Sequence, residues 1–439
     1  GETSMRIIFL TAIAVFVAFG PAAAETYGSH KRTSEYKIAS DSLGEKRMIY
    51  VRPPPAYDPS KTYPVVYVLD GEWNFEYVAS YLDYMADNEI YPDLIVTGVR
   101  NVNRNRDYVP RADPYFADTG EAGAFLDFVG NEWISLIEEK YPASGERILI
   151  GHSFGGVFTL HTLFTQPALF DAYIALGASA WIGDRVLFEE AAHYFADPQN
   201  ADAFVYMAVG EGDGGPTVPS GEALAALFQE EAPETLEWTF AITPKTDHFK
   251  NVASGIHDAF MALFPAWGFD EEVMAAAKEN GVAGVDQWFA EKEATLGWRF
   301  KPAWFDMGVA ALAMTSRGDG AAAMRLMAHM TRHYPDNAQV AAFAGNVFEQ
   351  NERFADAAAE YERAIRIARE HDLHPNAIHL DRLEESAARN RAAAENDALR
   401  KLWSDGVARG GWRSLRGVRF VPSHAASALA GPHEGEPIL

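Results

Sequence analysis

The chain has 439 residues, more than one hydrophobic core usually organises, so we expect two folded units. Acidic residues outnumber basic ones by 62 to 37, and the formal charge of −25 repels nucleic-acid phosphates, so we expect no nucleic-acid partner. The absence of cysteine excludes disulfides, thiolate nucleophiles and cysteine-bound zinc or iron–sulfur sites.

The N-terminal segment has the composition of a bacterial signal peptide. Met5 and Arg6 precede an apolar run over residues 7–19, and three alanines at residues 22–24 follow. We expect residues 1–24 to be a signal peptide with four appended residues before Met5, and the mature protein to be periplasmic or secreted. The apolar run falls short of the ~20 residues of a membrane span, and an uncleaved anchor is the alternative.

Residues 25–267 alternate between strand-like and helix-like segments. Two extended stretches lie between Glu35 and Pro53. Apolar runs of strand length follow at residues 65–69, 94–99, 148–150, 172–175, 204–209 and 238–242. Helical patterns separate several of them, at residues 124–139, 158–164 and 222–230. This order predicts a mostly parallel sheet with helices on both faces.

After Trp267 the sequence becomes alanine-rich amphipathic helix. We expect a helical linker over residues 268–303, a helical-repeat domain over residues 304–403 and a loose tail over residues 404–439. Within the repeat domain, a 34-residue period that starts at Ala338 has the small and aromatic positions of a tetratricopeptide repeat. Such repeats bind partners on a concave surface, so we expect a protein or peptide partner there, or simple packing of the hairpins.

The motif Gly-His-Ser-Phe-Gly-Gly at residues 151–156 follows one predicted strand and precedes a predicted helix. This is the context in which G-x-S-x-G forms the nucleophile turn of an α/β-hydrolase. Ser153 is therefore the expected nucleophile, and the backbone N–H of Phe154 is expected to face the developing oxyanion.

The same fold places an acid and then a histidine on loops after later strands. His248 follows the run at residues 238–242 and is the expected base. Two acids follow the run at residues 204–209, and we prefer Asp213 to Glu211 because it lies farther beyond the strand end. Asp247 adjoins His248 and would hardly reach Nδ1 of its own neighbour.

The loop after residues 65–69 should supply the second oxyanion donor. Gly71 permits close backbone approach, and we expect the Glu72 N–H to be the donor. The neighbouring Trp73 and the more distant Trp181 are candidates for the substrate pocket, although aromatic side chains beside loops often serve packing alone.

We expect no cofactor and no metal. His371, His374 and His379 lie at a polar helix end without ordered carboxylates. The loop that carries Asp213 lacks the alternating acids of a calcium site.

Between about residues 38 and 264 the chain resembles the bacterial putative esterase family, also called esterase D-like. The resemblance rests on five ordered blocks: residues 40–59, 63–75, 103–111 (Asn-Arg-Asn-Arg-Asp-Tyr-Val-Pro-Arg), 120–129 and 151–156. It implies an α/β-hydrolase fold and ester hydrolysis, in a family that includes siderophore trilactone hydrolases, feruloyl esterases and mycolyl transferases. It also makes Arg106 a candidate for substrate contact, with a structural ion pair as the alternative.

The chain departs from this family's pattern at one segment and adds helices after the matched region. Residues 177–182 differ from the Ser-Pro-Ser segment of many relatives, which argues against transferring a siderophore substrate. Some exported relatives append tetratricopeptide-like helices, as this chain does. The sequence thus predicts a serine carboxylesterase that works through an acyl-enzyme. The alternatives are a siderophore trilactone or feruloyl-type esterase, an acyltransferase that uses the same site, and a partner-binding protein with a vestigial hydrolase domain.

Overall fold

The computed structural model describes residues 32–88, 90–197, 203–265, 271–300, 304–371 and 378–408. The expected signal peptide, Trp267, His374 and residues 409–439 of the expected tail lie outside them. The chain divides into two compact units. The first, which we call the sheet unit, comprises residues up to Asp87 and Asp93–Ala259, and the second, the helical unit, comprises Asn88–Pro92 and the chain from Phe260 onward.

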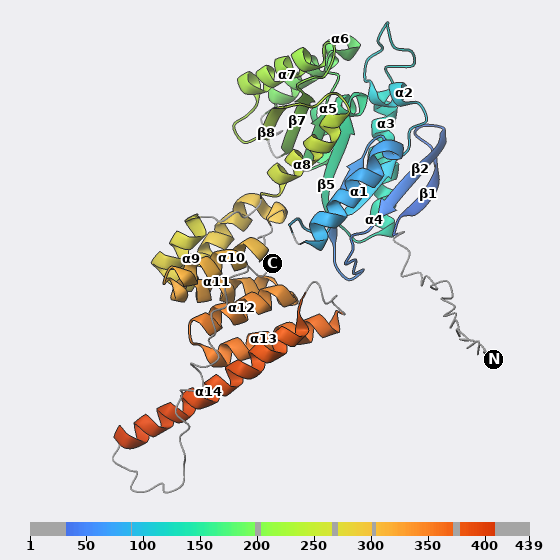
Figure 1. Ribbon diagram of the computed structural model, residues 1–439. Helices are drawn as coiled ribbons and strands as arrows, with labels where there is room; N and C mark the ends of the chain where they lie inside the picture. Colours follow the sequence, from blue (N-terminus) through green and yellow to red (C-terminus); the bar gives the residue numbers. More distant parts are fainter. Residues whose placement is uncertain are drawn as a thin grey trace, which may run out of the picture. The chain divides into compact units, whose positions relative to one another are not determined.

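The sheet unit is built on one eight-stranded sheet with the order β1-β2-β4-β3-β5-β6-β7-β8 (Figure 1). The strands are β1 Ser34–Ser40, β2 Glu45–Arg52, β3 Tyr63–Val68, β4 Ile95–Val99, β5 Ala143–His152, β6 Ala172–Leu176, β7 Phe204–Gly210 and β8 Glu237–Thr243. Strand β2 pairs antiparallel with β1 and β4, and the other neighbouring pairs are parallel. The expected mostly parallel sheet is confirmed, and each predicted apolar run overlaps one strand.

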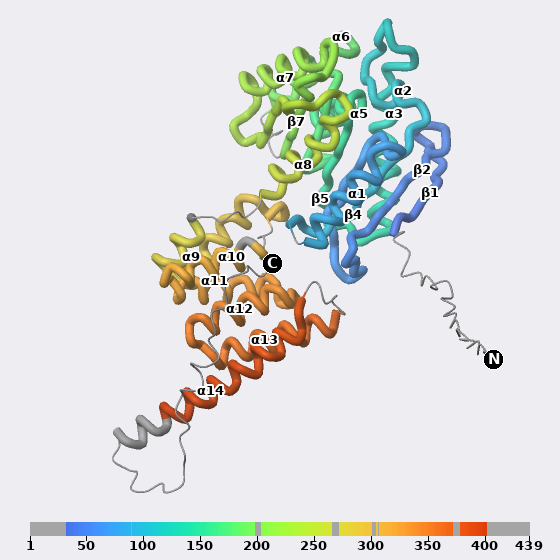
Figure 2. The backbone as a smooth tube through the Cα atoms, viewed as in Figure 1, coloured from blue at the N-terminus to red at the C-terminus, as the bar shows by residue number. Residues whose placement is uncertain are grey.

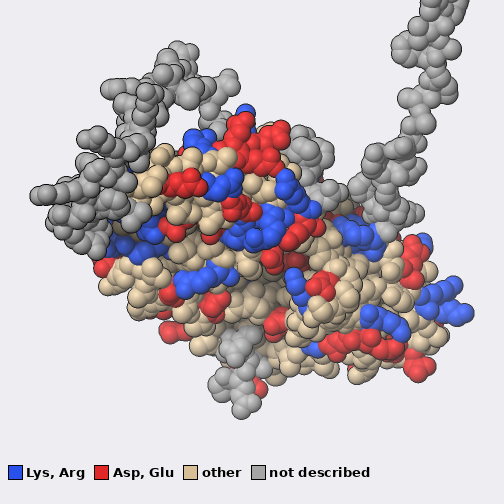
Figure 3. Space-filling view, turned by 90° about the horizontal axis from the view of Figure 1, so that it is seen from below, with Lys and Arg blue, Asp and Glu red and all other residues tan. Residues whose placement is uncertain are grey.

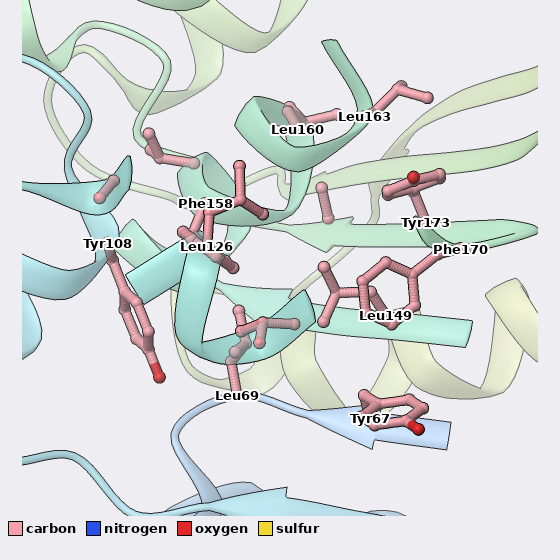
Figure 4. Packing of buried hydrophobic residues seen from close by; sticks show 14 of the residues in the cluster. Tyr67, Leu69, Tyr108, Leu126, Leu149, Phe158, Leu160, Leu163, Phe170 and Tyr173 are labelled. Atoms are coloured by element: carbon pink, nitrogen blue, oxygen red, sulfur yellow. The ribbon is translucent and has the colours of Figure 1, made fainter. Parts of the chain in front are cut away.

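Helices cover both faces of the sheet, since every residue of β6 and β7 is buried. The helices of this unit are α1 Gly71–Asp87, α2 Arg104–Tyr108, α3 Ala122–Phe128, α4 Ile134–Lys140, α5 Phe154–Thr165, α6 Ile182–Phe195, α7 Thr217–Glu231 and α8 Lys250–Leu263, of which the residues from Phe260 belong to the helical unit. Figure 4 shows Phe158, Leu160 and Leu163 of α5 above the strands that carry Leu149 and Tyr173. This apolar packing holds the start of α5, and with it the end of β5, in a fixed place.

The helical unit contains α-helices and no strand in its described residues. They are α9 Glu271–Leu296, α10 Trp304–Ser316, α11 Gly320–His333, α12 Ala338–Gln350, α13 Phe354–Glu370 and α14 Leu380–Ala408. Helix α9 occupies the segment that we expected to be a linker. Its Trp288 and Phe289 are buried in one cluster with residues of α10, α11 and α12, so α9 belongs to the core of this unit.

Helices α10 to α13 form two consecutive hairpins, which Figure 2 traces as a continuous tube. The starts of α10 and α12 are residues 304 and 338, and those of α11 and α13 are residues 320 and 354, so both pairs are spaced by 34 residues. A β-carbon at Gly345 would lie 2.8 Å from the Tyr361 ring, which explains the small residue that the period requires there. Helix α14 runs on to Ala408, beyond the expected end of the helical region at residue 403.

The surface charge is mixed in sign. On the face seen in Figure 3, basic and acidic side chains of the described residues are interspersed. Among the helices of the described residues, none is both long and apolar enough to cross a membrane.

Candidate active site

Ser153 lies on the turn between β5 and α5, in a conformation that few residues adopt. Its φ of 59° and ψ of −117° are strained for a residue with a side chain, and its N–H donates to the Leu176 carbonyl at 2.9 Å. A β-carbon at Gly151 would lie 2.1 Å from the carbonyl oxygen of Gly155, so only glycine permits this approach of strand and helix. The turn therefore raises the serine hydroxyl above the end of the sheet.

The loops after β7 and β8 bring Asp213 and His248 together. Nδ1 of His248 donates to the Asp213 carboxylate, at 2.9 Å to Oδ2 and 3.0 Å to Oδ1. The Asp213 side chain is 3% exposed, whereas that of His248 is 27% exposed. The acid is therefore enclosed, and the outer edge of the imidazole remains accessible.

The backbone of Gly177, just beyond β6, packs directly against this pair. A β-carbon there would lie 3.3 Å from Nδ1 of His248 and 3.4 Å from Oδ2 of Asp213, and the φ of 52° also favours glycine. Residues 177–182, which depart from the pattern of many relatives, thus begin at a position where a side chain would press on the acid and histidine.

The two other acids near His248 serve the backbone instead. Glu211 is exposed and accepts the N–H of Lys245 at 2.9 Å. Asp247 accepts the N–H groups of Phe249 and Lys250 at the start of α8, and the pKa of its carboxyl falls to about 2 because of hydrogen bonds from Lys250. Neither carboxylate contacts the imidazole of His248 in the described residues.

A cavity of about 690 Å³ opens beside the serine and the histidine. It is lined by Trp73, Asn74, Tyr77, Arg104, His152, Ser153, His248, Phe249, Val252 and Ala253. Trp73 on α1 and Phe249, in the turn just before α8, are exposed aromatic side chains. The cavity thus joins the nucleophile and base to a mostly apolar space with one cation, Arg104.

The expected oxyanion donors open two helices. Phe154 begins α5, and Gly71 and Glu72 begin α1, where first-turn N–H groups have no partner within the helix. The carbonyl of Asp70 takes the N–H groups of Trp73 and Asn74, but no hydrogen bond from Gly71 or Glu72 N–H occurs in the described residues. These N–H groups are therefore available to an incoming oxygen.

Two predicted substrate contacts lie elsewhere. Arg106 donates to Glu45 and to Asp107, so it belongs to a structural ion-pair network, the alternative that its sequence context left open. Trp181 packs against Phe116 at 5.7 Å between ring centroids and is absent from the cavity lining. Both were predicted from position near a motif, which does not determine the direction of a side chain.

Arg104 and His152 are among the cavity residues that the sequence patterns did not single out. Arg104 donates to the Asp70 carboxylate at 2.7 and 3.0 Å and to the His152 carbonyl at 2.8 Å. The block at residues 103–111 did point to this region, and the helical spacing of Arg104 and Tyr108, which both bond to Asp70, could have favoured Arg104 over Arg106.

The electrostatics of these two residues differ. Burial, and after it the adjacent His248, lower the pKa of His152 to about 4, so His152 is neutral near pH 7. Burial alone would lower the pKa of Arg104, but its hydrogen bond and charge pairing with Asp70 outweigh burial and raise it. The site therefore holds one fixed, neutralised cation and one uncharged second imidazole.

A nucleophile turn after β5, an acid after β7 and a histidine after β8 define an α/β-hydrolase. The pattern of the putative esterase family matches residues 40–266, more than half of the chain. The chain belongs to the putative esterase family and is a serine ester hydrolase.

Individual relatives support the same class. The chain is 33% identical over 120 residues to the siderophore enterobactin esterase of Emericella nidulans, a match that spans 24% of this chain and 39% of that protein. It is 29% identical over 174 residues to the siderophore triacetylfusarinine C esterase of Aspergillus fumigatus, over 36% of this chain and 60% of that protein. An IroE-like serine hydrolase from Shewanella oneidensis has 25% identity and a TM-score of 0.53, covering 69% of this chain and 99% of its own.

Proposed function

We propose that Ser153, His248 and Asp213 form a catalytic triad that hydrolyses carboxylic esters through an acyl-enzyme on Ser153. The main support is the His248 side chain, which bonds to a buried carboxylate through Nδ1 and lines the same cavity as Ser153. Because Nδ1–H is engaged by Asp213, Nε2 is the free acceptor for the serine proton.

The chemistry follows in two halves. Ser153 Oγ attacks the ester carbonyl while His248 takes its proton, and the N–H groups of Phe154 and Glu72 stabilise the oxyanion. The imidazolium then protonates the leaving alcohol. Water then attacks the acyl carbonyl and gives a proton to His248. His248 passes that proton to Ser153 Oγ as the bond to the acyl group breaks, which releases the acid and restores the free enzyme. An alcohol or sugar in place of water would make the same site an acyltransferase.

The test is Ser153→Ala with p-nitrophenyl acetate as substrate. We expect kcat to fall by at least about 10⁴-fold with unchanged thermal stability, because removal of a nucleophile costs several orders of magnitude. Ser220→Ala on α7, whose hydroxyl bonds to the Thr217 carbonyl, is the matched control and should keep full turnover. A Ser153→Ala enzyme with more than a tenth of normal turnover would contradict the assignment, whereas a wild-type protein without turnover would favour a vestigial site.

For the substrate, we propose a siderophore ester as the first alternative to a simple carboxylic ester. Two similar proteins carry siderophore esters in their names, and the cavity adds exposed aromatic rings of Trp73 and Phe249 to the Arg104 cation. A panel with a trilactone siderophore, a feruloylated sugar and p-nitrophenyl acetate ranks the candidates by kcat/KM. A trilactone no better than the acetate would exclude the siderophore assignment.

We also propose that the protein is exported and that α10 to α13 are tetratricopeptide-type repeats with a protein or peptide partner. Residues 5–24 support export, and the 34-residue spacing of the hairpins together with the contact of Gly345 and Tyr361 supports the repeat assignment. N-terminal sequencing of the protein from bacterial periplasm should show cleavage after Ala24. Crosslinking through a photoreactive residue at Gln339 of α12 should capture a defined partner, whereas the same probe at Arg400 of α14 should not.

A further inference from the structure

His152 is the residue just before the nucleophile, and it is linked to two other parts of the site. Its Nε2 lies 2.8 Å from the carbonyl oxygen of His248, and because a carbonyl accepts, Nε2 carries the proton. Its ring lies 4.5 Å from the His248 ring, centroid to centroid. The imidazole therefore holds the backbone of the loop that presents the base.

The backbone of His152 carries the second link. Its carbonyl oxygen accepts from Nη2 of Arg104, and the same guanidinium bonds to both oxygens of Asp70. Asp70 is fully buried and immediately precedes Gly71 and Glu72, the expected oxyanion donors. The planar guanidinium of Arg104 thus fixes the nucleophile turn to the oxyanion loop, because it bonds to the His152 carbonyl and to Asp70 at the same time.

We propose that His152 is a positioning residue that fixes the His248 loop and the oxyanion loop in register with Ser153. This inference rests on the proposed triad. Its physical basis is that small displacements of reacting groups are costly, about 10²-fold for a shift near 1 Å. His152 touches no reacting atom and acts through the His248 carbonyl and through Arg104.

The neutral state of His152 is part of this role. The charged and titratable groups that face it are His248, Asp213 and Arg104. A second positive charge 4.5 Å from His248 would oppose the imidazolium that forms when Ser153 is deprotonated. A buried, uncharged imidazole supplies the N–H donor without that repulsion.

The test compares two amides of different reach in the full-length protein. His152→Gln places an N–H donor close to the position of Nε2, whereas His152→Asn is one methylene shorter and cannot reach the His248 carbonyl. On p-nitrophenyl acetate we expect kcat of the Asn variant to fall about 30- to 100-fold with KM within about threefold of wild type. The Gln variant should recover kcat to within about fivefold of wild type.

Two further measurements separate positioning from packing. The rate of covalent labelling by a fluorophosphonate should fall in the Asn variant in parallel with kcat. The acid limb of its kcat/KM profile should move to lower pH, because a displaced imidazole is held less well by Asp213. Equal losses in both amide variants with an unmoved acid limb, or wild-type kcat in the Asn variant, would overturn the proposal.

A second variant covers the case in which His152 substitutions do not fold. Arg104→Lys can pair with Asp70 but lacks the planar fork needed to hold the His152 carbonyl as well. We expect about a tenfold lower kcat with little change in KM, and unchanged kcat would contradict this arm of the link. The Ser153→Ala variant tests the triad separately from the His152 and Arg104 variants. If Ser153→Ala remained active, the triad would be refuted whatever the result for His152.

Discussion

Each unit of the molecule contains a histidine bonded to an aspartate, and the two pairs are built in opposite ways. In the sheet unit, His248 is 27% exposed and Asp213 is 3% exposed. In the helical unit, Nδ1 of His329 lies 2.7 Å from Asp286, but there the histidine is 6% exposed and the acid 42%. Both histidines use Nδ1 to bond to their aspartate, but the two pairs are exposed at opposite ends.

Whether the histidine or the acid is the exposed partner decides whether the histidine can act as a base or only packs in the core. His329 stacks on Phe289 at 3.5 Å between centroids, and its Nε2 is buried without a partner in the described residues. His248 instead lines the cavity that contains Ser153. A histidine–aspartate pair can therefore perform acid–base chemistry only where the enclosed partner is the acid and the free nitrogen meets a substrate.

The strongest test of this comparison is to remove each histidine in turn. His248→Ala should lower kcat on p-nitrophenyl acetate by about 10⁴- to 10⁶-fold, because Ser153 loses its proton acceptor. His329→Ala should leave kcat within about threefold of wild type. The cavity left by the missing imidazole should lower the melting temperature. Loss of turnover in the His329 variant at a temperature where it is folded would show that the helical unit takes part in the chemistry.

The next test removes the charge of each acid. Asp213→Asn should cost about 10³- to 10⁴-fold in kcat, because the imidazole loses the partner that fixes its tautomer. Glu211→Gln should change kcat by no more than about threefold, since Glu211 contacts the Lys245 backbone and not the imidazole. Asp286→Asn should not change kcat. A larger loss from Glu211→Gln than from Asp213→Asn would transfer the acid's role to Glu211.

Most of the fold could be predicted from the sequence, because the central strands are buried on both faces and are therefore apolar throughout. The runs at residues 172–175 and 204–209 are entirely buried, so their strand pattern could be read without alternation. Helix α1 was not among the expected helices, although its buried residues keep helical spacing, because the exposed rings of Trp73, Tyr77 and Tyr84 interrupt the apolar pattern. The fold was therefore easiest to predict where burial was complete.

The site was predictable only as far as chain order determines it. Ser153, Asp213 and His248 follow strands in the order that the fold requires, and their roles stay predictions until the variants are made. Arg104 and Arg106 differ by two residues on a short helix, and the spacing of Arg104 from Tyr108 favours Arg104 only once Tyr108 is known to bond to Asp70. Contacts across the sheet end, such as Nε2 of His152 with the His248 carbonyl, join residues 96 positions apart and have no local signature.

The smallest expected effect concerns pH, and here the two units should behave alike. Burial lowers the pKa of His152 and of His329 to about 4, against about 6.5 in an unfolded chain. Between these values the unfolded chain binds more protons than the folded one. Stability from the neutral, buried imidazoles is thus complete above pH 6.5 and is lost as the pH falls toward 4. For His152 we expect a loss of about 2–3 kcal/mol at pH 4.

Melting curves between pH 7 and pH 4.5, followed by circular dichroism for all helices and by residual activity for the sheet unit, check this expectation. His152→Gln should flatten the pH dependence of the activity-based transition and leave the other transition unchanged, and His329→Gln should do the reverse, since each removes one titrating group from one unit. Carboxylates elsewhere protonate equally in all three proteins, so differences between them report these two imidazoles alone. If His329→Gln altered the activity-based transition as much as His152→Gln does, the two units would unfold as one, and the contrast between them would apply to chemistry but not to stability.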